Sequence, residues 1–514
     1  MYIEHISIPK IEVKKLYIKW NEKIDVSVDE IHIVTKTDNQ NLELQYKNLN
    51  NLFNQLAFFQ DWFGEVALNS VTIDDIAANF KYSSTEGGFL KASSPTFSFK
   101  SKLFFEQSLL NIKIEEFKDL KNKIAIDGNI ILNSNTFNIA TNLHVDINQD
   151  ALFDIFINAE NDKIRYRVDS LKNITDLKHI IDIFNFPNGV TYWVQDAIEM
   201  SALSVDSFSG WIDSQNISEA YKNIQIKANV ADLVYTYDKQ LDSVHTLTTE
   251  LEFKDGILFI RPKDAYSYNF FLDKSWLKID FSKKEELLTL HLLFKGMLNK
   301  ELLGLLNRYK INLPLLQRTG SVDTNLKLEV NLRTIDVHAK GEFFTKKANI
   351  DYLGLNLDIT DTFISLNNFS VNIPHMLVQY KDILNSKVNV TFNAKEHIGQ
   401  VKLDINDIAF KEANLYLKKE KESLHVLYNI VPNQDILNIE PSQWMFKKHL
   451  ISLDKMVIPF DLNTLKAEIP ATLLEIKNIA SALVSGEASL KSQKIDLDVD
   501  LLKYAYKNIE GYLH

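Results

Sequence analysis

The property that most restricts the fold of this chain is the period of its hydrophobic pattern, which is two. From Val322 to Leu332 every second residue is apolar or threonine, whereas the residues between them, from Asp323 to Arg333, are polar. The same alternation runs through residues 224–230, 388–394 and 401–405. Successive side chains of a β-strand point to opposite faces, so the pattern predicts strands with one apolar and one polar face. Long apolar runs, which are typical of parallel strands, are scarce, and we therefore expect an antiparallel sheet built as a meander.

Several of these strands share an interruption. Two alternating apolar residues are followed by a two-residue break that ends in an acidic residue, and then by two more apolar residues. This pattern occupies residues 26–33, 228–235 and 403–410, with a partial copy at 112–117. After such a break the apolar residues would face the opposite side of the sheet, unless a β-bulge brought them back to the original side. We interpret these sites as bulges that keep a strongly twisted sheet facing one way; chance similarity among many short strands is the alternative.

Asparagine and aspartate are expected to form most of the turns. The chain has only 15 glycines and 10 prolines among 514 residues, whereas ordinary shares are about 7% and 5%. Asn and Asp tolerate left-handed backbone and bind the main chain of the residues that follow. On this basis residues 132–137, 159–164 and 366–369 are predicted hairpin turns.

Helical spacing of apolar residues occurs in four places, namely 49–63, 177–184, 302–309 and 473–483. Asp176 and Asn299 precede the second and third and are candidate N-caps. The first helix is rich in aromatic residues, among them Phe59 and Trp62. It could close one end of a groove, touch a membrane or pack on the sheet as a cap.

The helices also suggest how the chain is divided. Each precedes a series of strands, and the first three begin roughly 125 residues apart, which is repeat-like spacing. We therefore predict five segments: N-terminal strands at 1–48, helix-plus-strand repeats at 49–175, 176–298 and 299–469, and a helix with the start of a further repeat at 470–514.

So few helices cannot cover the apolar side of all the predicted strands, which number on the order of 35 at about 12 residues per strand and turn. The apolar face must pack against a second sheet in a sandwich, close into a barrel, or curl into an open groove that holds something apolar. The low glycine content and the inserted helices argue against a membrane barrel. Strands that follow one another with few domain boundaries favour the groove over a series of sandwiches.

Sequence patterns for catalysis, metal binding or nucleic-acid binding are missing. The chain has no cysteine, and its 12 histidines are scattered without a His-Glu-x-x-His motif. Nucleotide-binding loops and a Gly-x-Ser-x-Gly motif are absent. Asp496, Asp498 and Asp500 alternate with apolar residues and fit a solvated strand face better than a calcium site. The net charge of -11 is spread along the chain, which argues against nucleic acid as a partner. We expect neither an enzyme, a metal site nor a cofactor.

Degenerate β patterns in several segments are similar to those of a known family. They occupy residues 6–20, 192–198, 228–258 and 320–369. Together they resemble the bacterial AsmA-like proteins of the YhdP and TamB group, over most of the chain. The resemblance implies a mainly β fold: a long, twisted antiparallel sheet curled into an elongated hydrophobic groove, a repeating β-groove with a few short helices between strand repeats.

The resemblance also implies a function. Such bridge-like lipid transfer proteins bind phospholipid acyl chains in the groove and carry them through the periplasm between the inner and outer membranes of a double-membraned bacterium. Family members are typically anchored in the inner membrane by an N-terminal helix. Residues 1–20 have no signal-peptide core, and no stretch approaches the about 18 apolar residues that a spanning helix needs. We therefore expect the anchor and the contacts with both membranes to lie outside this sequence.

Two other functions stay open. One is an envelope-assembly scaffold for outer-membrane proteins that carries no lipid itself. The other is an extracellular adhesin or fibre made of β-sandwiches.

The groove hypothesis assigns the lipid-contacting lining to the apolar positions of the alternating strands, and ordinary core packing is the alternative for the same positions. The predicted lining residues are Ile224, Ile226, Val230, Val322, Leu326, Leu328, Val330, Leu332, Val388, Val390, Phe392, Val401, Leu403 and Ile405.

Overall fold

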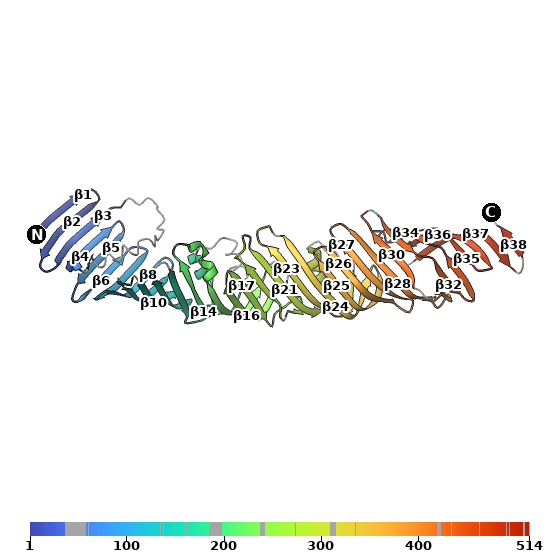
Figure 1. The fold of residues 1–514 in the computed structure, drawn as a ribbon, viewed down its shortest axis with the longest axis horizontal. Helices are drawn as coiled ribbons and strands as arrows, with labels where there is room; N and C mark the ends of the chain where they lie inside the picture. Colours follow the sequence, from blue (N-terminus) through green and yellow to red (C-terminus); the bar gives the residue numbers. More distant parts are fainter. Residues whose placement is uncertain are drawn as a thin grey trace. The chain divides into compact units, whose positions relative to one another are not determined.

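The computed structural model describes the chain outside residues 36–57, 60, 134, 137, 161–162, 185–197, 237–241, 273, 309–314, 335, 419–422, 433, 462, 490, 493, 507–508 and 513–514. The chain forms two compact units. Unit 1 contains Met1–Lys263 and Lys278–Glu286, and unit 2 contains Asp264–Leu277 and Leu287–His514. Each is a long, twisted β-sheet whose strands are almost all antiparallel, which confirms the predicted mainly β class (Figure 1). The division into five repeat segments stays a prediction.

The strands of unit 1 are β1 (Tyr2–Ile8), β2 (Ile11–Trp20), β3 (Ile24–Ile33), β4 (Phe63–Ile73), β5 (Ile76–Ser83), β6 (Gly87–Ser93), β7 (Phe97–Glu106), β8 (Leu109–Asp119), β9 (Ile124–Asn133), β10 (Asn138–Ile147), β11 (Ala151–Glu160), β12 (Lys163–Ser170), β13 (Ile198–Glu199), β14 (Ala202–Asp213), β15 (Gln225–Tyr235), β16 (Val244–Lys254) and β17 (Ile257–Lys263). The strand β20 (Trp276–Asp280) contributes residues to both units.

The remaining strands of unit 2 are β18 (Tyr266–Ser267), β19 (Phe270–Phe271), β21 (Leu287–Gly296), β22 (Leu315–Gly320), β23 (Val322–Asn331), β24 (Val337–Tyr352), β25 (Leu355–Asn367), β26 (Ser370–Tyr380), β27 (Leu384–Asn393), β28 (Ile398–Phe410), β29 (Leu415–Leu417), β30 (Leu424–Ile430), β31 (Asp435–Ile439), β32 (Ser442–Phe446), β33 (His449–Leu453), β34 (Met456–Asp461), β35 (Lys466–Ile476), β36 (Ala480–Ser489), β37 (Lys494–Tyr506) and β38 (Ile509–Tyr512).

Most strands pair with their neighbours in the chain, as expected for a meander. Every strand from β4 to β11 pairs antiparallel with the next, and so does every strand from β23 to β27. The pair β3–β4, by contrast, is parallel.

Asx side chains close many of the hairpins, as the composition predicts. Asp119 at the end of β8 accepts backbone N–H bonds from residues 121 and 122, at 2.9 and 3.0 Å. Asn133 at the end of β9 accepts the same bonds from residues 135 and 136, at 3.0 and 3.2 Å. At the predicted turn 366–369, Asn368 has φ 52°, and β25 and β26 pair on either side of it. The predicted turns 132–137 and 159–164 lie partly outside the described residues.

Two of the predicted bulges are confirmed. In β8 the ladders to both neighbouring strands shift by one residue at Glu115 or beside it. In β28 the ladder to β27 shifts between Ile405 and Asp407, leaving Asn406 as the extra residue. Each extra residue restores the phase of the apolar positions on its two sides.

The other two interruptions differ from the prediction. β3 and β15 keep their registers with β2 and β16. In β15, Asp232 has φ 49° and stands opposite Leu247, so both strands carry an irregularity at the same point. Thr246 and Thr249 of β16 are both buried, and their hydroxyls bond at 2.7 Å although the residues are three apart. The apolar residues on either side of this point thus keep to one face in β15 and β16 alike.

Two of the four predicted helices are confirmed, α2 (Lys178–Phe184) and α4 (Lys300–Arg308). Asp176 and Asn299 cap them by accepting backbone N–H bonds at 2.7 and 2.8 Å. A 3₁₀ helix, η2 (Ile217–Asn223), was not predicted. Most of 49–63 lies outside the described residues; Phe58, Phe59 and residues 61–62 are helical, but residue 63 already begins β4.

The helix predicted at 473–483, which was to open the segment 470–514, is wrong. These residues belong to β35 and β36, which form a hairpin. Leu473 pairs with Leu483 and Ile476 pairs with Ala480, and the two pairs lie on opposite faces of the hairpin. Apolar residues on both faces of two strands, joined by a short turn, imitate the spacing of a helix.

Candidate functional site

The apolar positions of unit 2 form one continuous face. Directly paired residues of an antiparallel ladder point to the same side of the sheet, so a row of partners can be followed from strand to strand. One such row, from β21 to β30, is Leu292, Leu326, Gly341, Leu366, Val371, Phe392, Gly399 and Ile430. A second row, from β26 to β34, is Met376, Val388, Leu403, Val426, Ile439 and Met456.

All predicted lining residues of unit 2 lie on this apolar face. The ladders pair Val388 with Leu403 and Val390 with Val401. The predicted lining residues on β23 share the face through the ladders of this strand to β21 and β24. Leu332 directly follows the last residue of β23. In unit 1, Ile226 and Val230 share a face with each other and with the partners of Val230 on β14. Ile224 lies just before β15, after η2.

Burial on this face falls from the middle of the strands towards their ends. Ala348, Ile359, Val378 and Val388 are 2–8% exposed and form one cluster, which we call the floor. Half-buried residues pack beside the floor and form the walls; they are Ile350, Leu357, Met376, Val390, Val401 and Leu403. A flat single sheet would expose its apolar face evenly, so a buried floor between half-buried walls means that the sheet curls.

In the described part of each unit, every strand is hydrogen-bonded to neighbours within that unit's own curled sheet, and no separate second sheet covers the apolar face. The total accessible surface is 32528 Å² for a mass of 59.3 kDa, whereas two compact globules of half that mass would expose about 23,000 Å² together. At the edge of the face, Leu332 and Val337 are 37% and 51% exposed. Leu497 and Val499 on β37 are 52% and 62% exposed.

Small hydroxyl side chains run through the floor. Thr345, Thr362 and Ser386 are 4%, 1% and 0% exposed. Thr345 pairs with Thr362 across the β24–β25 ladder. The Oγ1 atom of Thr345 is buried without a hydrogen-bond partner. These residues occupy the inside of the bend, where large side chains from converging walls would collide.

A fixed polar group interrupts the apolar face of unit 2. Asp435 is 6% exposed and accepts a hydrogen bond of 2.6 Å from the Tyr428 hydroxyl and one of 3.1 Å from the backbone N–H of Val431. Burial, together with the bond to Asp435, raises the pKa of Tyr428. Burial also raises the pKa of Tyr352, and the negative charge of Asp435 adds to this shift. The alternation pattern did not reveal this group, because Asp435 stands alone at the start of a short strand.

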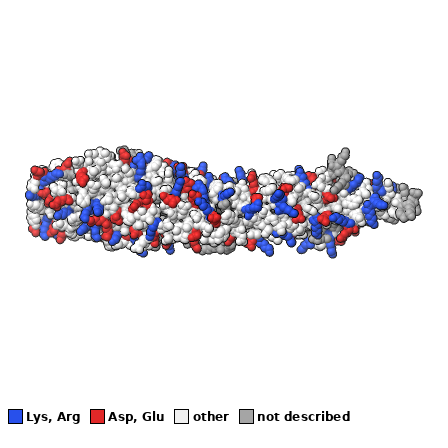
Figure 2. All heavy atoms as spheres, turned by 90° about the horizontal axis from the view of Figure 1, so that it is seen from below, with Lys and Arg blue, Asp and Glu red and all other residues white. Residues whose placement is uncertain are grey.

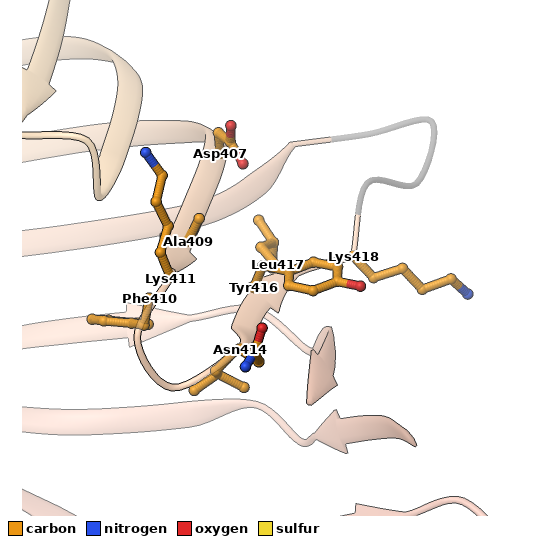
Figure 3. Close-up of a pocket in the computed structure, with 9 residues that line it drawn as sticks. Asp407, Ala409, Phe410, Lys411, Asn414, Tyr416, Leu417 and Lys418 are labelled. Carbon is orange, nitrogen blue, oxygen red and sulfur yellow. The ribbon is translucent and has the colours of Figure 1, made fainter. Parts of the chain in front are cut away.

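An open hollow of about 510 Å³ lies beside the β28–β29 hairpin (Figure 3). Phe410 and Tyr416 on its border are 44% and 42% exposed. Figure 3 shows Phe410 and Lys418 pointing in different directions, so its side chains do not converge on one point. Catalytic sites need convergent polar groups in an enclosed space, and this hollow does not supply them.

Charge does not define a second site. On the face shown in Figure 2, basic and acidic side chains of the described residues are interspersed, and neither sign gathers into a continuous patch. The described residues also contain no group of three or more His, Asp or Glu side chains placed to hold a metal ion. None of the described helices has the length and apolar character needed to cross a membrane. The apolar face is therefore the feature of this structure that most needs a partner.

Comparison with protein-family models finds no family that matches this chain, and comparison with curated proteins finds no match either.

Proposed function

We propose that this protein binds the hydrocarbon chains of phospholipids along its apolar face and carries them across the periplasm between the inner and outer membranes. The single observation that supports this most is the curled sheet of unit 2, whose apolar walls are half-buried and face no second sheet among the described residues. The sequence resemblance described above supports the choice of phospholipid, periplasm and membranes.

The energetics of lipid in water favour such a surface. Moving a diacyl lipid with about 30 methylenes into water costs roughly 24 kcal/mol at about 0.8 kcal/mol per methylene. A continuous apolar wall replaces water along the route, while the headgroup stays in solvent at the open side. Because the rows of Leu, Ile, Val and Phe are chemically alike, acyl chains can slide from one strand to the next without covalent chemistry.

Native mass spectrometry of protein purified without detergent tests lipid binding directly. We expect several phospholipids per chain, and organic extraction of the same sample should identify them. Protein that carries no lipid after such a purification, and takes none from vesicles, would contradict the proposal and favour the scaffold alternative.

Charge substitutions on a wall distinguish a groove from a core. Replacing Leu328 and Leu403 with Asp should block photo-crosslinking of lipid nearby and leave the circular dichroism spectrum largely unchanged, because both side chains are half-buried on the apolar face. Lys402→Asp, on the opposite face of β28, is the matched control and should leave crosslinking intact. Collapse of unit 2 in the double variant would show that the walls are an ordinary core.

A further inference from the structure

Helix α2 packs on the apolar face of unit 1. Val145, Ile147, Ala151 and Ile174 form a buried cluster, 0–8% exposed, to which β10 and β11 contribute three members. The residues of the helix and its entry that pack against this cluster are Leu177, Ile180 and Ile183. In Figure 1 the helical segments coloured green lie by β14.

The face beneath α2 is the same one that contains the predicted lining residues of unit 1. Leu203 and Val205 of β14 belong to the partly buried residues around the cluster. Leu203 pairs with Val230 across the β14–β15 ladder, so the two side chains point to the same side of the sheet. The helix and a lipid chain would therefore need the same surface.

The sheet does not need α2 for its continuity. β12 pairs directly with β14, and the segment that contains the helix leaves the sheet after β12 and comes back to it. Ile174 anchors the entry by two backbone hydrogen bonds with Leu203, of 2.8 and 2.7 Å, and Asp176 caps the helix. Ile181, on the helix itself, is 6% exposed. The helix is thus held in place on the apolar face by specific contacts.

We propose that α2 is a built-in occupant of the lipid-binding face: its branched side chains take the place of acyl chains over β9–β14, and lipid binds there only when the helix lifts. This inference rests on the proposed function, because it names the position at which lipid and protein compete. At 1.5 Å per residue the helix covers about 10 Å of the face. Displacement of α2 would then control passage through unit 1.

Photo-crosslinking at two positions tests the competition in the full-length chain. A benzophenone amino acid replaces either Phe153, which packs against the same buried cluster as α2, or Phe392 on the apolar face of unit 2. The probe is a vesicle of phosphatidylethanolamine and phosphatidylglycerol. We expect strong lipid labelling at 392 and several-fold weaker labelling at 153. Ile180→Ser with Ile181→Ser should raise labelling at 153 several-fold and leave labelling at 392 unchanged.

The control is Ile217→Ser, the same change at a 51% exposed position of η2, which should alter neither site. Equal labelling at 153 and 392 in the parent chain would overturn the role of α2 and leave the proposed function standing. Absence of labelling at both positions would overturn the proposed function itself.

Hydrogen exchange of the parent chain provides a test that needs no helix variant. Lipid vesicles should accelerate amide exchange in Lys178–Phe184 if lipid displaces the helix. Unchanged protection there, with lipid crosslinked at position 153, would contradict the proposal.

Discussion

At the scale of single residues, the hairpins depend on Asx side chains, and two of them, Asp119 and Asn133, form a matched pair at the turns before and after β9. The side chain of Asp119 closes the β8–β9 turn, and that of Asn133 closes the β9–β10 turn, through equivalent backbone bonds. The pKa of Asp119 is lowered by hydrogen bonds to its carboxylate. The bond from the backbone N–H of Asn122 has the largest effect, and those from the Asn122 side chain and the Lys121 N–H add to it. Only one member of the pair can titrate.

This difference predicts a pH dependence. A lowered folded-state pKa gives stability that is fully present above the unfolded value of about 3.9 and is lost as pH falls through the folded value. Asp119→Ala should therefore destabilise the protein more at pH 7 than at pH 3, whereas Asn133→Ala should cost about 1 kcal/mol at both. Urea denaturation followed by circular dichroism measures both differences. An equal loss for Asp119→Ala at the two pH values would contradict the role of the charged carboxylate.

The buried hydroxyl of Thr345 predicts a stabilising substitution. Its Oγ1 atom has no hydrogen-bond partner, whereas that of Thr362, across the ladder, donates to the carbonyl of Thr360 at 3.3 Å. Leaving a buried polar group unsatisfied costs about 1–3 kcal/mol. Thr345→Val should thus raise the free energy of unfolding by about 1 kcal/mol, and Thr362→Val should not. Thermal denaturation of the two variants compares them, and a loss of stability in Thr345→Val would refute this account.

At the scale of elements, the bulges decide which side chains face inward. In β28 the buried residues Ile405 and Ile408 are three apart, and the extra residue Asn406 lies between them. Deleting Asn406 would leave the two isoleucines at regular strand spacing on the same face. Deleting Lys402 would instead turn part of the strand over and bring Asp404 to the inside.

We therefore expect a large difference between these two deletions. Deleting Asn406 should cost less than about 2 kcal/mol, whereas deleting Lys402 should cost more than about 4 kcal/mol or unfold this region, since it buries a charge and exposes apolar residues. Urea denaturation and hydrogen exchange of the region from β27 to β30 measure the effect. Similar losses for the two deletions would show that the bulge does not set the phase.

The sequence was a good guide to elements whose pattern is local. The alternation around β23, β27 and β28 predicts both the strands and their shared face, because the period of two is a direct result of strand geometry. The caps Asp176 and Asn299 identify two helices for an equally local reason. The prediction fails at 473–483, where apolar residues lie on both faces of a hairpin, and Asp435 could not be predicted because it stands alone at the start of a short strand.

At the scale of the whole molecule, the half-exposed apolar walls predict a small change in heat capacity on unfolding. The heat capacity of compact proteins rises by about 12–15 cal/mol/K per residue on unfolding, mostly because apolar surface becomes exposed to water. A sheet whose apolar walls are already half-exposed has less apolar surface left to expose on unfolding. Differential scanning calorimetry of lipid-free protein should therefore give a value per residue below that range. A value within it would indicate that the walls are covered in solution.

The contrast between floor and walls has a consequence for tolerance to substitution. On the floor, protein packs against protein, and the small residues Ala348, Thr345 and Ser386 are almost fully buried. Along the walls the proposed neighbour is a fluid chain that adapts to any contour. Exchanges among leucine, isoleucine, valine and phenylalanine at Val390 or Val401 should hardly change the stability of the protein, whereas one added methyl group at Ser386 should lower it. In such a molecule, selection would act on side-chain shape at the floor and only on side-chain hydrophobicity along the walls.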